Sequence, residues 1–180
     1  MPPSTRSSLA TLSLAMLLSS LGTSIANVAL PTLAVAFHAS FQEVQWIVLA
    51  YLLAITTLIV SVGRLGDLIG QRRLMLTGLG LFTFASLLCG LSPTLRLLIA
   101  ARAVQGLAAA IMMVLTMSLV GETVSKEKSG SAMGLLGTMS AIGTAFGPTL
   151  GGLLIAGLGW RSIFLVNIPL GVLNLVLAQR

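Results

Sequence analysis

The chain has 180 residues, of which 56% are hydrophobic and only 8% are charged. A soluble domain needs a charged surface, and this composition does not supply one, so a soluble globular protein is excluded. The net charge of +6 would suit nucleic-acid binding, but there is no basic stripe and aromatic residues make up only 5%. We therefore expect no nucleic-acid partner.

Six long apolar runs follow one another along the sequence. About 20 apolar residues in a helix are needed to cross the roughly 30 Å of a bilayer's hydrocarbon core. Strands of a membrane barrel would be shorter and would alternate in polarity, which these runs do not do. The pattern predicts an all-α membrane protein, a six-transmembrane-helix bundle, with spans at about 8–30, 44–63, 74–92, 95–120, 131–156 and 162–178. The first run is too long for the core of a signal peptide, so we expect it to be a retained helix.

The basic residues are unevenly divided between the two sides of the predicted bundle. If the N-terminus is cytoplasmic, only Arg96 and Arg161 fall outside the cell, and Arg102 falls within the fourth span. Lys and Arg are enriched in cytoplasmic loops. We expect a multi-pass protein of the inner (plasma) membrane with both termini cytoplasmic. The residues expected inside are Arg6, Arg64, Arg72, Arg73, Lys126, Lys128 and Arg180.

The connector predicted after the second span, residues 63–73, is rich in glycine and charge. Its glycines allow a tight turn, and Asp67 can form a charge cluster with nearby arginines at the membrane surface. The segment resembles the loop 2–3 motif of the major facilitator superfamily, with Leu68 and Gln71 in place of basic residues. The resemblance implies a cytoplasmic gating loop that latches two halves of a transporter together. A set of topology-determining charges is the alternative. The candidate gating residues are Gly63, Asp67, Gly70, Arg72 and Arg73.

An arginine lies inside the fourth span, where it costs roughly 2.5–3.5 kcal/mol at the bilayer centre. Arg102 lies about 10 Å from the start of the helix at 1.5 Å per residue, so its side chain could extend to the outer interface. Alternatively it faces a cavity, with Gln105 on the same helix face. Residues 98–110 resemble the helix 4 motif of the same family, which implies a role for Arg102 in proton transfer. We expect Asn27, Arg102 and Gln105 to face a proton and substrate pathway.

The fifth span carries three glycines at intervals of four residues, which places them on one helix face. Small residues at this spacing let helices approach closely in lipid, and a proline in the run bends the helix. General packing explains this pattern. However, residues 143–152 also resemble the helix 5 motif of the family's antiporters, which implies export. The motif residues are Gly143, Gly147, Pro148, Gly151 and Gly152.

Two further segments, residues 21–31 and 159–171, resemble the helix 1 motif and the helix 5–6 segment of the fourteen-helix drug:proton antiporter subfamily. Gly22 stands where many members have an aspartate. The chain's four acidic residues are all expected near the membrane surfaces, so no deep carboxylate is available for proton coupling. They are Glu43, Asp67, Glu122 and Glu127.

Together these resemblances imply the N-terminal half of a proton-coupled efflux antiporter for drugs or other small, hydrophobic or cationic molecules, with a role in antibiotic resistance. We expect the proton gradient as its energy source and no cofactor. The sequence has no nucleotide-binding loop, metal-ligand cluster or hydrolase constellation, so we expect no enzyme. Because the chain ends after the sixth span, we expect a fragment of a longer carrier, whose partners are the bilayer and a missing C-terminal half or a second copy. A non-transporting membrane scaffold or assembly protein and a homodimeric half-transporter are the alternatives.

Overall fold

The computed structural model describes residues 3–179, without the side chains of residues 3–6 and 60. The described part contains helices and no strand. Six helical segments are long and apolar enough to cross a membrane, with α6 and α7 forming the sixth together. The predicted all-α bundle of six spans is thus confirmed. The helices are α1 (Pro3–Phe37), α2 (Phe41–Ile69), α3 (Gln71–Leu91), α4 (Leu95–Thr123), α5 (Lys126–Leu158), α6 (Ser162–Leu165) and α7 (Asn167–Gln179).

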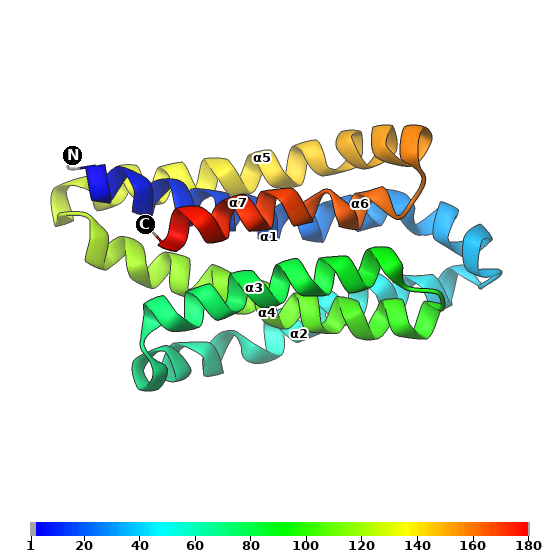
Figure 1. The fold of residues 1–180 in the computed structure, drawn as a ribbon, viewed down its shortest axis with the longest axis horizontal. Coiled ribbons are helices and arrows are strands. Elements are labelled where there is room, and N and C mark those ends of the chain that lie inside the picture. The colour runs from blue at the N-terminus through cyan, green and yellow to red at the C-terminus, as the bar shows by residue number, and fades with distance from the viewer. Residues whose placement is uncertain (1–2, 180) are drawn as a thin grey trace.

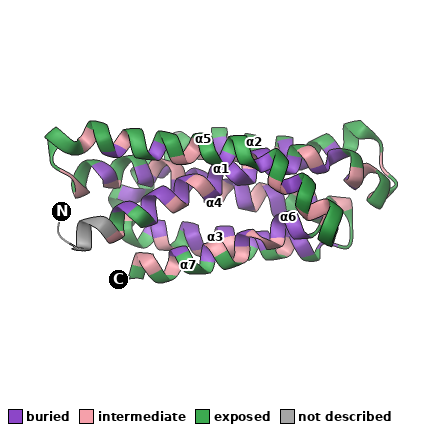
Figure 2. Cartoon of the chain, turned by 90° about the horizontal axis from the view of Figure 1, so that it is seen from above, coloured by how far each residue is buried: buried purple, intermediate pink, exposed green. Residues whose placement is uncertain are grey.

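The helices lie roughly along one axis, and both chain termini are at the same end (Figure 1). We call this the proximal end; the α2–α3 and α4–α5 turns lie there too, and the α1–α2, α3–α4 and α5–α6 connections lie at the distal end. The closest helix pairs are α1 with α5, α2 with α4, and α3 with α4. The first helix therefore packs mainly on a helix that is distant in sequence. Figure 2 shows buried positions concentrated on α1 and α4, and much exposed surface on α5.

The helices extend well beyond the predicted apolar runs. α1 continues past Pro31 to Phe37, and α2 continues through Gly63 to Ile69. The expected connectors at 31–42 and 63–73 are therefore mostly helical, which corrects the prediction. Hydropathy marks only the segment that suits lipid, whereas the backbone hydrogen-bond ladder continues beyond it. Between α2 and α3 the helical path breaks at Gly70 alone, whose φ of 94° favours glycine.

Local side chains determine where several helices begin. Ser40 and Glu43 form a capping box at the start of α2, with Ser40 N donating to Glu43 Oε2 at 2.8 Å. Thr94 Oγ1 accepts from Leu97 N at the start of α4. The predicted span 162–178 is divided into α6 and α7 near Val166. Pro169 explains this break, because it has no N–H to continue the helical ladder.

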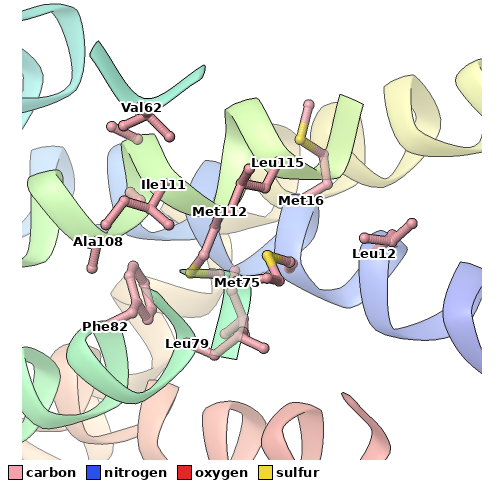
Figure 3. Close-up of a cluster of buried hydrophobic side chains, with 14 of the residues drawn as sticks. Leu12, Met16, Val62, Met75, Leu79, Phe82, Ala108, Ile111, Met112 and Leu115 are labelled. Carbon is pink, nitrogen blue, oxygen red and sulfur yellow. The ribbon is translucent and has the colours of Figure 1, made fainter. Parts of the chain in front are cut away.

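Two apolar clusters fill the bundle, one toward each end. The proximal cluster includes Met75, Phe82 and Met112, which Figure 3 shows among the side chains that fill its centre. The distal cluster includes Ile47 and Leu98. Methionine adapts to irregular gaps, which suits a core between four crossing helices. Along α1, α2, α3 and α4 the two clusters meet at one level, and the polar site described next lies at that level.

Candidate functional site

The guanidinium of Arg102 lies at the boundary between the two apolar clusters, and its side chain is 0% exposed. Nε donates to Ile47 O of α2 at 3.1 Å, and Nη2 donates to Gly22 O of α1 at 3.1 Å. Nη1 donates to Gln105 Oε1 at 2.6 Å. One arginine thus joins α1, α2 and α4 through three of its donors.

Aromatic rings complete the surroundings of this cation. The Tyr51 ring centroid lies 4.0 Å from Arg102 Cζ, and the Phe164 centroid lies at 5.9 Å. The ring faces carry partial negative charge, so they stabilise a guanidinium that has left water. The Tyr51 hydroxyl donates to Ser19 O at 2.9 Å, which ties the same ring to α1. Desolvation of Arg102 is therefore offset by rings and carbonyls rather than by a carboxylate.

Gln105 extends this polar layer to a fourth helix. Its Nε2 donates to Ser86 Oγ of α3 at 2.7 Å, and Ser86 Oγ donates to Phe82 O at 2.7 Å. Both Gln105 and Ser86 are fully buried. A buried polar network is stabilising when its members are satisfied, and here the chain's own helices satisfy them. We call Arg102, Gln105, Ser86 and Tyr51 the arginine layer.

These positions bear on the two alternatives that the sequence left open for Arg102. Its side chain points into the bundle and does not extend to the outer interface. Neither Arg102 nor Gln105 is exposed in this bundle, and their place in a proton and substrate pathway stays a prediction. Asn27 lies apart from the arginine layer: it is exposed, and its Nδ2 donates to Thr23 O of its own helix at 3.3 Å. The structure therefore joins two of the three predicted pathway residues, and leaves Asn27 on a different surface.

A close helix crossing supports the arginine layer. A β-carbon at Gly106 would collide with the Tyr51 carbonyl oxygen and would lie 2.9 Å from Ala54 Cβ. Only glycine lets α4 approach α2 this closely. This approach brings Arg102 within reach of the Ile47 carbonyl. At Gly22, a β-carbon would lie 3.2 Å from the Tyr51 hydroxyl, so a side chain here would point at the same layer.

The glycine face of α5 packs directly against α1. A β-carbon at Gly143 would lie 2.8 Å from Leu17 O, and one at Gly147 would collide with Ser24 Oγ. Two hydrogen bonds reinforce this contact: Ser24 Oγ donates to Gly143 O at 3.3 Å, and the Ser20 and Ser140 hydroxyls lie 2.7 Å apart. The predicted close approach along this face is thus observed, and its partner is the first helix.

Not all residues of the helix 5 motif share this face. Gly151 is buried against Ile25, whereas Pro148 and Gly152 are exposed. Nothing lies within 4 Å of a β-carbon added at Gly152. The motif therefore divides into a face packed on α1 and an exposed flank that carries Pro148 and Gly152. On the other flank of the glycine face, Phe146 is 63% exposed.

The predicted gating loop borders a hollow of about 680 Å³ at the proximal end. Asp67, Gly70, Arg72 and Arg73 line it, whereas Gly63 does not and is exposed. Within residues 3–179, no ion pair joins Asp67 to these arginines. The charged residues expected to cluster therefore line one hollow but form no direct salt bridge.

The hollow also brings together two residues that sequence reasoning did not pair. Gln71 Nε2 donates to Glu122 Oε1 at 2.9 Å, which joins the first residue of α3 to the last turn of α4. Both residues line the same hollow as Asp67. Sequence reasoning also missed Tyr51 and Ser86. Tyr51 could have been found in the sequence, because it is the single tyrosine of the chain and lies within an apolar span.

Residues 12–180 match the family model of the Major Facilitator Superfamily, which is nearly the whole chain. The chain belongs to the major facilitator superfamily. It is therefore a multi-pass membrane protein from a family of transporters, as the motifs of the second, fourth and fifth spans indicated.

Several curated bacterial proteins are similar to this chain. It is 44% identical over 154 residues to the multidrug resistance protein Stp of Mycobacterium tuberculosis, covering 85% of this chain and 29% of the relative. It is 38% identical over 160 residues to the riboflavin transporter RibZ of Clostridioides difficile, covering 89% and 35%. The methylenomycin A resistance protein of Streptomyces coelicolor is 36% identical over 164 residues, covering 91% and 34%. The chain spans about a third of the length of these relatives.

Proposed function

We propose that this chain forms the N-terminal six-helix half of a proton-coupled antiporter, which exports drugs or other small, hydrophobic or cationic molecules across the bacterial plasma membrane. The proposed branch is the fourteen-helix drug:proton antiporters. The rest of a longer carrier supplies the second half, and the proton gradient supplies the energy without a cofactor. Two six-helix halves of this family bind substrate at their interface near the bilayer midplane.

The observation that carries the proposal is the helix 5 motif as it is built here. Gly143, Gly147 and Gly151 pack α5 against α1, while Pro148 and Phe146, on the two flanks of that glycine face, stay exposed. This arrangement supports a bundle in which one face of α5 is packed on α1 and the rest of α5 is available to contact a further domain. The names of two relatives, a multidrug resistance protein and an antibiotic resistance protein, support export as the direction of transport.

Export is tested by expressing a full-length carrier that contains this segment in a bacterial strain lacking its own drug exporters. We expect lower accumulation of a fluorescent cationic dye than in empty-vector cells, with the difference removed by a protonophore. Riboflavin serves as a second substrate, because one relative is named for its transport. Equal accumulation of both compounds in carrier and vector cells would contradict the proposal.

Expression of the 180-residue chain on its own distinguishes the proposed half-carrier from its alternatives. We expect it to insert but to give no resistance above the vector level. Resistance that is lost in Arg102→Ala would instead favour a homodimeric half-transporter. A scaffold would leave dye accumulation unchanged even in the full-length protein.

Orientation gives a prediction of its own. Positively charged connections at the proximal end favour a cytoplasmic location for that end, although the side chain of Arg6 and all of Arg180 lie outside the described residues. A phosphatase fused after Ser92, at the distal end, is expected to be active. The same enzyme fused after Lys126 is expected to be inactive. The reverse activities at either position would overturn the proposed topology.

The hollow at the proximal end gives a second prediction. Asp67 lines it without a salt-bridge partner among the described residues, so its carboxylate is available to bind the second half. Asp67→Ala is expected to reduce dye efflux by the full-length carrier at least about tenfold, because a charged hydrogen-bond partner contributes about 1.5–3 kcal/mol. Efflux is compared at equal membrane expression, with Arg64→Ala, an exposed charge outside the hollow, as the matched control. Wild-type efflux by Asp67→Ala would leave the loop as a topology signal only.

A further inference from the structure

A second, smaller cavity lies inside the proximal end of the bundle, apart from the glycine face and the arginine layer. Its volume is about 300 Å³, and it is partly open to the outside. Residues of α1, α3, α4 and α7 surround it. Most of the lining is apolar, with Leu12, Met75, Leu76, Leu119, Leu177 and Ala178 contributing.

One buried polar group in this lining has no partner. Thr11 is 6% exposed, and its Oγ1 makes no hydrogen bond. A buried hydroxyl without a partner costs about 1–3 kcal/mol. Because Thr11 lines the cavity, a ligand in the cavity can satisfy this hydroxyl.

The cavity also has a charge at its rim. Arg72 lines it, and this is the one charged residue among the described lining residues. Arg72 is exposed and forms no ion pair within residues 3–179. It is also the second residue of α3, where the free N–H groups of the helix add partial positive charge. This edge therefore attracts an anion.

One leucine of α3 and one of α7, Leu76 and Leu177, belong to the apolar lining of the cavity. About two turns farther from the proximal end, the two helices close on each other where Gly171 lies against Thr83. A molecule with an anionic head at Arg72 would thus have apolar side chains beside the first part of its tail.

We propose that this cavity binds an anionic phospholipid, with its phosphate at Arg72, a headgroup or glycerol oxygen at Thr11, and the start of an acyl chain beside Leu76 and Leu177. A phospholipid has both the charge and the apolar tail that the lining matches. The proximal end is the proposed cytoplasmic end, and a basic side chain at a membrane surface attracts anionic lipid headgroups. The site requires neither the arginine layer nor substrate transport.

The test is lipid retention by the protein purified from nanodiscs and measured by native mass spectrometry. Nanodiscs contain equal amounts of phosphatidylglycerol and phosphatidylcholine. We expect preferential retention of phosphatidylglycerol. Arg72→Gln is expected to reduce this retention about fivefold, the effect of one basic residue near an anionic surface. Arg73→Gln is the matched control, because Arg73 is equally exposed but does not line this cavity. Equal losses in both variants would overturn the proposal.

Two further variants test the cavity itself. Thr11→Val keeps the shape and removes the hydroxyl, so we expect about threefold weaker retention, with Thr138→Val, an exposed threonine, unchanged. Leu177→Trp fills the cavity and is expected to abolish retention. Unchanged retention in Leu177→Trp would overturn the proposed location.

The source of the phosphate is tested in the same experiment. Inorganic phosphate at millimolar concentration is expected not to displace the lipid, because it has no apolar tail. Displacement would mean that the site recognises free anions, and would overturn the lipid proposal. A full-length carrier that retains no phosphatidylglycerol, where the 180-residue chain does, would show that the rest of the protein covers the cavity, and would overturn it too.

Discussion

Replacing Arg102 by alanine in a full-length carrier is expected to abolish proton-coupled exchange while the protein still inserts into the membrane. The substitution removes hydrogen bonds to Ile47 O, Gly22 O and Gln105 Oε1, all inside the bundle. Because these acceptors belong to α1, α2 and α4, the substitution removes the hydrogen bonds that hold these three helices together at this level. The loss of a buried hydrogen-bonding partner costs about 1–3 kcal/mol, which lowers stability without preventing insertion.

Exchange is measured in vesicles with an imposed pH gradient, and substrate counterflow without a gradient is measured in parallel. We expect counterflow to persist in Arg102→Ala and proton-driven uptake to be lost. Arg102→Lys keeps the charge but not the planar arrangement of donors, so an intermediate rate is expected. Arg96→Ala, an exposed arginine of the same helix, is the control. Intact proton-driven uptake in Arg102→Ala would exclude Arg102 from coupling, and loss of both activities would reduce its role to holding the helices together.

Gly147→Val is expected to give a large loss of stability. Its β-carbon would occupy the position of Ser24 Oγ and would lie 3.1 Å from Ile25 N. A backbone neighbour cannot move aside as a flexible side chain can, so α5 must separate from α1. Overpacking typically costs about 1–3 kcal/mol.

The measurement is the thermal midpoint of the detergent-solubilised protein, followed by size-exclusion chromatography after heating. Gly152→Val is the matched control, since it lies in the same helix and nothing stands within 4 Å of its added β-carbon. Its midpoint is expected to stay close to that of the unaltered protein. Similar losses in both variants would mean that valine weakens α5 by itself, independently of the contact with α1.

The sequence predicted faces and residue types better than it predicted partners. The spacing of Gly143, Gly147 and Gly151 correctly indicated a close helix approach, but a repeat of 3.6 residues identifies a face and not the helix opposite it. The pair Arg102 and Gln105 could be recognised on one face of α4. Two of the three acceptors of Arg102, at Gly22 and Ile47, are backbone carbonyls, which have no signature in the sequence.

The helix ends were the least predictable part of the fold. Residues 63–69 look like a loop because they are polar and rich in glycine, yet they form the last turns of α2. Their helical hydrogen bonds do not require a lipid environment, so polarity alone does not end the helix. Gly70 does, through its positive φ. Whether Asn27 takes part in the transport pathway is still a prediction; its exposed side chain donates a hydrogen bond to its own helix.

The pairing of α1 with α5 determines the order in which this bundle can be completed on the ribosome. The two residues joined by the Ser24–Gly143 hydrogen bond are 119 positions apart. At about 5–20 residues per second, roughly 6 to 24 s of translation separate their synthesis. During that interval, the Ser20 and Ser24 hydroxyls of α1 have no α5 to contact. The first helix to enter the membrane therefore obtains its principal partner only when the fifth arrives, and until then lipid or the insertion machinery must cover its small-residue face.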